Sequence, residues 1–176
     1  VNKVRRVDLD GIIRTVAGTG TIGFSPDAST ALAANMSDTR WLVEYPVGTG
    51  GFIVSEYANG IVRQVDGDGG TWVLAGAGDG GAAFSEGAIA TSVKLSSPRC
   101  LSMTESGDLL MSGDNRVMRY SFTTKQLSLV AGNGVSTASA DGTLATAAGL
   151  YTACGLAGPD GGVYLLESEN WKVRSI

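Results

Sequence analysis

Short runs of alternating apolar and polar residues, separated by Gly, Asp, Asn and Pro, follow one another along the whole chain. Alternation with a period of two places successive side chains on opposite faces of a strand, and the small residues between the runs are typical of turns. No segment keeps the helical period. The pattern therefore predicts an all-β chain, with strands at residues 4–9, 12–16, 41–45, 52–56, 61–65, 71–74, 99–103, 108–112, 117–120, 126–130, 154–157, 163–166 and 172–176.

One motif recurs four times, and it consists of Val or Met followed directly by arginine within a strand. The residue before the arginine is Val4, Val62, Met118 or Val173, which gives successive repeat lengths of 58, 56 and 55 residues. Each full repeat supplies four short strands and one long loop. A period of this size with four strands is the signature of a β-propeller blade.

The repeats divide the chain into complete and partial blades. Residues 36–78 and 95–134 are expected to form complete blades, and residues 1–20 and 150–176 to form partial ones. The chain thus holds about three blades, whereas propellers typically have about four to eight. Because an open stack would expose apolar faces and strand edges, we expect residues 1–176 to be one segment of a larger propeller. Further blades of the same polypeptide, or other copies of the chain in a multi-chain assembly, would complete it.

The repeated landmarks resemble those of NHL-repeat β-propellers. Each unit has Asn-x-x-Val-Arg or a close variant, then Ala-Gly-x-Gly, then a loop that in two units ends in Ala-Thr. The residues that carry the resemblance are Asn2, Asn59, Asn115 and Asn170, the arginines Arg5, Arg63, Arg119 and Arg174, and the Ala-Thr pairs at 90–91 and 145–146. The resemblance covers essentially the whole chain and implies a propeller of about six blades. It implies no single function, because such propellers act as enzymes, nucleic-acid binders and protein-binding platforms.

The four repeated arginines are interpreted as structural residues. A residue that stands at the same place in every blade usually does the same structural job, and repeated, partly buried ion pairs can organise a fold. Glu56, Asp114 and Glu169 lie shortly before the arginines in their repeats and are the expected partners. The alternative is that the arginines form a ring of ligand-binding cations.

Composition narrows the functions open to this chain. There is no His, which removes the commonest general base and the His ligands that hold a metal in some propeller lyases and hydrolases of the resembling family. No Gly-x-Ser-x-Gly elbow, phosphate loop or zinc motif occurs. We therefore expect a non-catalytic chain without a cofactor. The alternative is part of a propeller enzyme, of lyase or hydrolase type, whose catalytic residues lie outside this chain.

The sequence also bears on calcium binding, nucleic-acid binding and membrane insertion. Residues 66–70 resemble the start of a calcium loop, but Ala77 stands where such a loop has Glu, so hairpin turns are the preferred interpretation. Lys and Arg total 13 against 17 Asp and Glu and are spread along the repeats, which argues against nucleic acid. No apolar run approaches the roughly 20 residues of a membrane helix, so membrane insertion is not expected.

A sequon and two cysteines bear on the compartment. Asn35 begins the Asn-Met-Ser sequence of a glycosylation site, in a loop where a glycan would be exposed. Aligning Leu95 with Leu150 places Cys100 and Cys154 one position out of register on first strands of adjacent blades, so that they would point toward each other. We predict a disulfide, with two small buried hydrophobic residues as the alternative. Together these features favour an extracellular or cell-surface protein.

Aromatic residues at strand ends are the candidates for recognition. Most tyrosines and tryptophans alternate within strands and are expected to pack between blades, whereas Tyr57, Tyr151 and Trp171 lie at strand ends or in loops. The sequence therefore predicts an interaction or structural module, in which rigid blades hold variable loops at the two rims and protein or glycan partners bind there.

Overall fold

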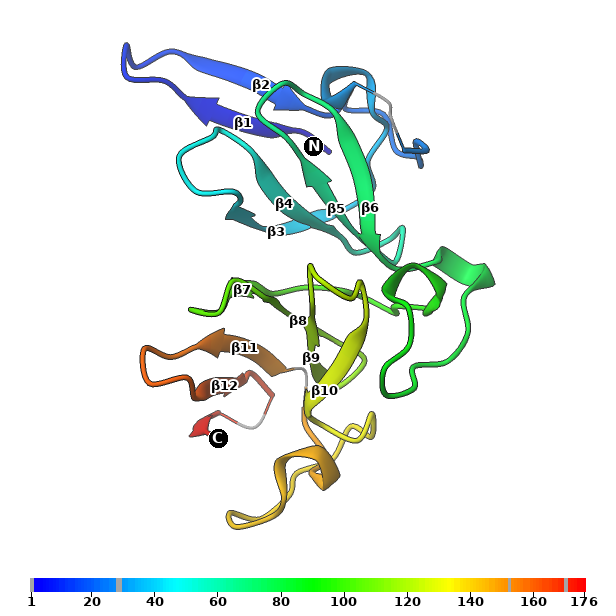
Figure 1. Ribbon diagram of the computed structural model, residues 1–176, viewed down its shortest axis with the longest axis vertical. Coiled ribbons are helices and arrows are strands. Elements are labelled where there is room, and N and C mark those ends of the chain that lie inside the picture. Colours follow the sequence, from blue (N-terminus) through cyan, green and yellow to red (C-terminus); the bar gives the residue numbers. More distant parts are fainter. Residues whose placement is uncertain (1, 28–29, 152, 170) are drawn as a thin grey trace.

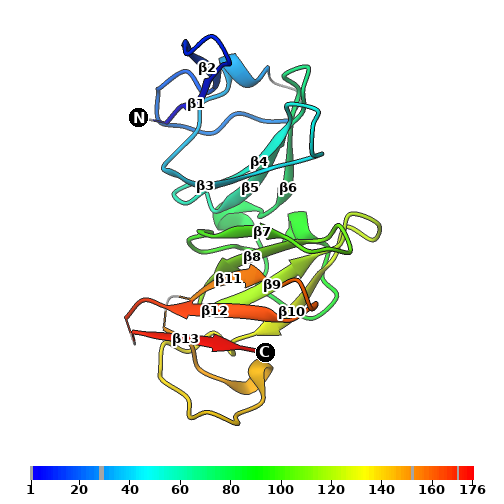
Figure 2. The same ribbon diagram turned by 90° about the vertical axis from the view of Figure 1, so that its left-hand side faces the viewer.

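The computed structural model is a stack of four antiparallel β-sheets (Figures 1 and 2), and it describes residues 2–27, 30–151, 153–169 and 171–176. The strands are β1 (Val4–Val7), β2 (Ile13–Ala17), β3 (Thr39–Glu44), β4 (Phe52–Glu56), β5 (Ile61–Val65), β6 (Thr71–Ala75), β7 (Leu101–Met103), β8 (Leu109–Gly113), β9 (Arg116–Tyr120), β10 (Leu127–Ala131), β11 (Ala153–Ala157), β12 (Val163–Glu167) and β13 (Lys172–Ser175). The predicted all-β class is confirmed.

Strands pair in chain order within each sheet. Two sheets have four strands, β3-β4-β5-β6 and β7-β8-β9-β10, whereas β1-β2 and β11-β12-β13 are smaller. In Figure 1 β7 and β11 lie on the left, the β6–β7 connection lies on the right, and the β10–β11 connection lies at the lower end of the stack. The long connections between sheets contain the 3-10 turns η1 (Ala31–Ala33), η2 (Gly78–Gly80), η3 (Ala90–Ser92) and η4 (Ala145–Ala147). Among the described residues, no helix is long and apolar enough to cross a membrane.

Apolar side chains fill the three spaces between neighbouring sheets. Because a strand presents alternate residues to its two faces, each central sheet contributes to two of these cores. Between the two four-stranded sheets, Ile53 and Val62 pack against Leu109 and Met111. The other two cores lie on the outer faces of these sheets, around Val54 in one case and Leu110 in the other.

The repeated Ala-Gly pairs close each sheet against the loop that follows. Ala17, Ala75 and Ala131 have no exposed surface. The next residue has a positive φ, 96° at Gly76, and a Cβ there would lie 2.2 Å from the carbonyl oxygen of Gly60. Only glycine adopts this φ so close to another backbone segment without strain.

Sheet register separates Arg119 from the other repeated arginines. Val62 pairs with Ala75 and Val117 pairs with Ala131, so that the residue after the valine is Arg63 in one sheet and Met118 in the next. Arg119 follows one position later. Its side chain therefore lies on the opposite face of its sheet, and the predicted equivalence of Arg119 with the other three does not hold in the ladder.

A difference in turn length explains this shift. Four residues, 57–60, connect β4 to β5, because Glu56 pairs with Ile61. Only Asp114 and Asn115 connect β8 to β9, with φ values of 56° and 55°. Positive φ at both positions is the mark of a two-residue type I′ hairpin. Because the β8–β9 turn is shorter, Arg116, the residue after Asn115, already pairs as Ile61 does in the preceding sheet. Arg119, four residues after Asn115, therefore lies one position beyond the ladder position that Arg63 holds.

Candidate functional site

Two of the repeated arginines are in ion pairs between strands. Nε of Arg63 lies 2.6 Å from Oε1 of Glu56, and both side chains are fully buried. Nε of Arg174 lies 2.8 Å from Oε1 of Glu167, a contact without hydrogen-bond geometry. Glu56 was among the expected partners, whereas the carboxylate beside Arg174 is two residues before the expected Glu169. A buried pair of this kind contributes to the specificity of packing more than to a binding surface.

The other two repeated arginines have different surroundings. Arg5 is exposed on β1. Nε of Arg119 is buried without a hydrogen-bond partner among the described residues. Asp114, the partner expected for Arg119, accepts a hydrogen bond from the backbone of Ser96 instead, at 2.9 Å.

The three predicted recognition residues lie in turns and connections at one end of the strands. Tyr57 belongs to the β4–β5 turn and Trp171 to the β12–β13 turn, where it is 93% exposed. Tyr151 is half-buried in the segment that leads into β11. We call this surface the loop rim; it comprises the β4–β5, β8–β9 and β12–β13 turns and the segments that lead into β7 and β11.

Tyr57 is in contact with two arginines at the loop rim. The guanidinium carbon of Arg40 lies 4.9 Å from the centre of the Tyr57 ring, and that of Arg99 lies 5.2 Å from it. Cation–π contacts of this length are attractive. Side-chain hydrogen bonds with Ser97 and Arg99, and the positive charge of both arginines, lower the pKa of the Tyr57 hydroxyl.

Arg40 and Arg99 are equivalent residues of neighbouring sheets. Arg40 lies two residues before Leu42, which pairs with Val54. Arg99 lies two residues before Leu101, which pairs with Met111 in the equivalent place. Two residues before each arginine the backbone has positive φ, 51° at Asp38 and 66° at Ser97. The sheets therefore present the same backbone at this place with different side chains.

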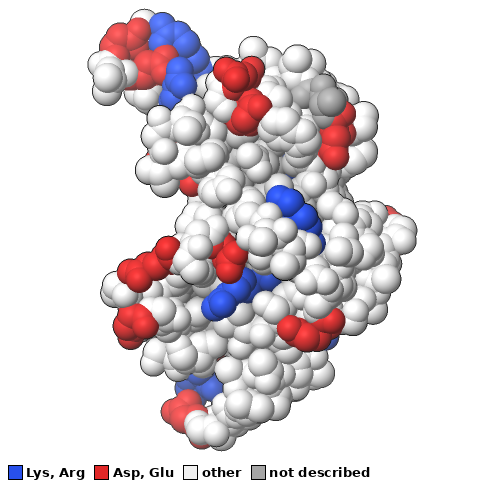
Figure 3. Space-filling view, in the orientation of Figure 1, with Lys and Arg blue, Asp and Glu red and all other residues white. Residues whose placement is uncertain are grey.

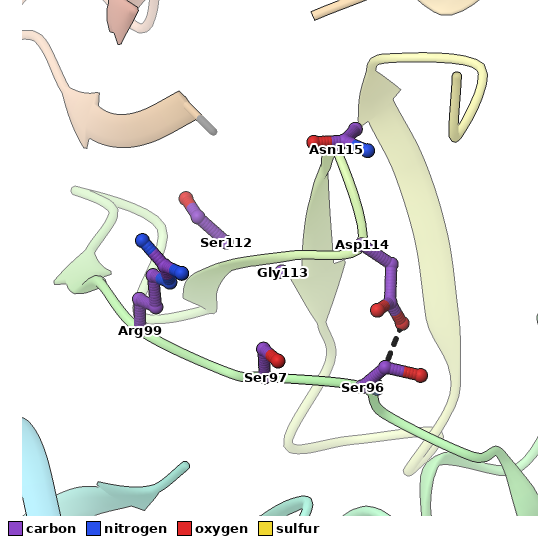
Figure 4. Close-up of a pocket in the computed structure, with 7 residues that line it drawn as sticks. All are labelled: Ser96, Ser97, Arg99, Ser112, Gly113, Asp114 and Asn115. Atoms are coloured by element: carbon purple, nitrogen blue, oxygen red, sulfur yellow. Dashed lines mark hydrogen bonds between the residues drawn. The ribbon is translucent and has the colours of Figure 1, made fainter. Parts of the chain in front are cut away.

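A small polar hollow of about 200 Å³ adjoins Arg99. It is lined by Ser96, Ser97, Arg99, Ser112, Gly113, Asp114 and Asn115. Figure 4 shows Arg99 and Asp114 at opposite ends, with Ser97 between them. Gly113 pairs with the first residue of β9 as Glu56 pairs with the first residue of β5, so Gly113 holds the ladder position of Glu56 and brings no side chain to the hollow.

Charge on the visible face is distributed in small patches of both signs (Figure 3). Arg40 is neutralised by Asp38, whose Oδ2 lies 2.7 Å from its Nη2. Arg99 makes no ion pair within the described part of the chain. The hollow is therefore a place where an anionic group would meet an uncompensated guanidinium.

The predicted disulfide is present. Cys100 and Cys154 are bonded, with their Cα atoms 5.4 Å apart. Their predicted offset of one position is wrong, because Cys154 pairs with Leu166 in β12 while Cys100 lies opposite Ser112, the corresponding residue of β8. The connection from Leu150 to Cys154 is one residue shorter than that from Leu95 to Cys100, which brings the cysteines into register. A disulfide is typical of an oxidising, non-cytoplasmic compartment.

The structure shows the surroundings of two residues predicted to lie in loops, Asn35 of the sequon and Asp66 of the calcium-like turn. The Asn35 side chain is half-buried rather than exposed, and its Oδ1 accepts a hydrogen bond from Thr19 at 2.7 Å; glycosylation at Asn35 stays a prediction. Asp66 Oδ1 accepts hydrogen bonds from the backbone of Asp68 at 3.0 Å and of Gly70 at 2.7 Å. This carboxylate is thus engaged by the turn it begins, as expected of Asp at a hairpin tip. No cluster of three potential metal ligands occurs among the described residues.

Sequence reasoning found Tyr57 but missed Arg40, Arg99 and Gly113. The signal was in the repeat: Arg40 and Arg99 have the same distance to the following leucine, and Asp38 aligns with Ser97. The alignment of repeats does not show that both arginines approach the Tyr57 ring, because this contact depends on how closely β3 and β7 converge.

Comparison with known proteins supports the fold. No protein-family model matches the chain, and no curated protein sequence does either. A protein of unknown function from Bacteroides thetaiotaomicron superimposes with a TM-score of 0.73 at 16% identity, over 99% of this chain and 42% of that one. An auxiliary nutrient binding protein from the same organism gives 0.72 at 12% identity, with the same two coverages. Virginiamycin B lyase from Staphylococcus aureus gives 0.52 at 13% identity, over 99% of this chain and 48% of the lyase.

These structures are β-propellers, and the chain has the fold of part of one. It spans less than half the length of each of the three, and at these identities the similarity establishes the fold alone.

Proposed function

We propose that this chain is a segment of a larger, NHL-like β-propeller that acts as a non-catalytic interaction module outside the cell or at its surface. The observation that carries the proposal is the loop rim, where Arg40 and Arg99 contact Tyr57 beside a polar hollow. Loops positioned by a rigid scaffold are the usual place for binding residues. The disulfide supports the extracellular location.

The chemistry of the hollow supports binding more than catalysis. General acid–base catalysis needs titratable groups placed on both sides of a reacting atom. Asp114 is the one carboxylate that lines the hollow, and the backbone amide of Ser96 holds one of its oxygens. Serine hydroxyls and an arginine make up most of the rest, which suits recognition of a polar ligand by hydrogen bonds.

Similar structures allow both a binding role and an enzymatic one. One of them is named as a nutrient binding protein, which accords with the present proposal. Another is named as a lyase, and it is the observation that favours the alternative. In that alternative this chain is part of a propeller enzyme, of lyase or hydrolase type, whose catalytic residues lie outside residues 1–176.

A printed array of neutral and acidic oligosaccharides, probed with the intact protein, tests the proposal. We expect binding to a subset of the sugars, weakened by Trp171→Ser or Arg99→Gln at the rim, and recovery of the bound sugar with unchanged mass. Leu9→Ser is the matched control, because Leu9 is fully exposed at the tip of the β1–β2 hairpin. Conversion of the sugar into a product would favour the enzymatic alternative. Binding that neither rim variant affects would refute the role of the rim.

A further inference from the structure

We propose that the hollow beside Arg99 binds the carboxylate of an acidic sugar, of the hexuronic acid type, presented by a glycan. This inference rests on the proposed function, since it names the ligand of the same rim. Its starting point is a comparison of two neighbouring sheets that present the same backbone with different side chains.

The carboxylate that neutralises Arg40 has no counterpart beside Arg99 in the described part of the chain. In the sheet β3–β6, Asp38 neutralises Arg40 at 2.7 Å. The equivalent residue of the next sheet is Ser97, and Arg99 has no ion-pair partner among the described residues. Serine also adopts the positive φ of this position less readily than Asp does, yet it stands here. A carboxylate supplied by a ligand would restore the pair that Asp38 and Arg40 form.

Gly113 gives the sheet β7–β10 no side chain at the ladder position that Glu56 holds in the preceding one. It lines the hollow of about 200 Å³, and Asp114 Oδ2 accepts the Ser96 amide there as Glu56 Oε2 accepts the Ser37 amide. Drug-sized ligands need pockets of about 300 Å³ or more, so this hollow is of the size for one sugar ring or less. The fold therefore provides room for a small carboxylate-bearing group next to an uncompensated cation.

The guanidinium of Arg99 is held in place by Tyr57. A guanidinium binds a carboxylate through two parallel hydrogen bonds when it is held in one orientation. The Tyr57 ring, 5.2 Å from the guanidinium carbon of Arg99, restrains it, and the pKa of the Tyr57 hydroxyl is lowered by side-chain hydrogen bonds with Ser97 and then Arg99. Because arginines occupy the ring, Tyr57 acts as a positioning residue and not as a platform on which a sugar stacks.

The end of the hollow opposite Arg99 is suited to hydroxyl groups and not to a second anion. Asp114 lies across the hollow from Arg99 (Figure 4), and its charge would repel any anionic group placed at its own end. Oδ2 of Asp114 accepts from Ser96, whereas Oδ1 makes no hydrogen bond with a described residue. Oδ1 of Asp114 and the hydroxyl of exposed Ser96 are suitable partners for hydroxyl groups. Ser112 Oγ, in contrast, accepts from the backbone of Gly155 at 2.8 Å, and the Ser97 side chain forms a hydrogen bond with Tyr57. A ligand with a carboxylate at one end and hydroxyls at the other complements both ends.

Isothermal titration of the intact protein with sodium glucuronate tests the proposal. We expect glucuronate to bind, glucose not to bind, and Ser97→Asp to weaken glucuronate binding about tenfold or more, because the new carboxylate would occupy Arg99. Asp is well suited to a φ of 66°, so the melting temperature of this variant should not fall. Ser106→Asp is the matched control, since it adds the same charge at the exposed β7–β8 turn.

Each other result of the titration is decisive. No heat with glucuronate up to about 50 mM, or equal binding by the Ser97→Asp variant, would overturn the proposal. Glucose bound as tightly as glucuronate would show that the carboxylate is not recognised. Sodium glutamate or phosphate bound as tightly would show that the sugar hydroxyls are not. In all of these cases rim-dependent binding on the sugar array would still uphold the interaction module, whereas its absence would refute that broader proposal separately.

Discussion

Replacing Arg63 with methionine should leave the carboxylate of Glu56 buried without its cation. Both side chains have no exposed surface, and Nε of Arg63 lies 2.6 Å from Oε1 of Glu56. Removal of one partner of a buried pair typically costs about 3–5 kcal/mol, because the remaining charge stays out of water. The neighbouring sheet shows that the fold accepts the apolar alternative, since Met118 and Gly113 hold these two positions there.

The magnitude should fall at the lower end of that range. Glu56 keeps two other hydrogen bonds to its Oε2, from Asn59 Nδ2 at 2.6 Å and from the backbone of Ser37 at 3.4 Å. We therefore expect Arg63→Met to lower the free energy of unfolding by about 3 kcal/mol. Adding Glu56→Gln removes the buried charge and keeps a side-chain oxygen for Asn59. The double variant should then lie within about 1.5 kcal/mol of the parent protein.

Urea denaturation of the four members of this double-mutant cycle, which are the parent, the two single variants and the double variant, measures the effect. A destabilisation of 3 kcal/mol corresponds to a fall in melting temperature of roughly 6–12 °C for a unit of this size. The coupling energy should be about 1.5 kcal/mol or more, with the double variant more stable than Arg63→Met alone. Additive losses in the double variant, or an Arg63→Met variant within about 0.5 kcal/mol of the parent, would refute the reasoning.

Three further predictions concern the disulfide, a glycine and Tyr57. Replacing both Cys100 and Cys154 by Ser should lower the free energy of unfolding by about 4 kcal/mol, because the bond closes a long loop with a sequence separation of 54; thiol titration of the unreduced, denatured protein should find neither sulfur free. Gly76→Ala should cost roughly 3 kcal/mol or prevent folding, since its Cβ would lie 2.2 Å from the Gly60 oxygen, whereas Gly80→Ala, with open space around it, should change stability by no more than about 0.5 kcal/mol in the same melt. In an ultraviolet titration read as the difference from Tyr57→Phe, Arg99→Gln should raise the pKa of Tyr57 toward its ordinary value; an unchanged transition, or an equal rise with the control Arg5→Gln, would contradict the hydrogen bond and charge assigned to Arg99.

Much of the fold could be predicted from local pattern. Alternation of apolar and polar residues shows strands because it follows from the two-residue period of an extended backbone. The recurrence of Ala-Gly pairs showed the four-strand unit, and the structure gives the reason: the alanine is buried and the glycine passes close to another backbone segment. The disulfide was predictable too, because cysteines on the first strands of adjacent sheets lie close enough to bond, here with Cα atoms 5.4 Å apart.

Contacts between sheets could not be predicted in the same way. A turn of two residues in place of four moved Arg119 one position along β9 and to the other face, although its neighbouring motif is intact. A connection shorter by one residue brought Cys100 and Cys154 into equivalent positions. Both changes are small in sequence, and the first reverses the direction of the Arg119 side chain because successive residues of a strand point to opposite faces.

The sequence by itself determined that this chain is a repeating all-β segment, and it marked Tyr57, Tyr151 and Trp171 as loop residues. Only the tertiary structure decided which of them has a polar environment suited to binding. Arg40 and Arg99 are far apart in sequence and meet at Tyr57 because the first strands of neighbouring sheets converge. The hollow lies between the segment that leads into β7 and the β8–β9 turn, which β7–β8 pairing brings together, and Gly113 and Ser97 hold the places there that Glu56 and Asp38 hold in the preceding sheet.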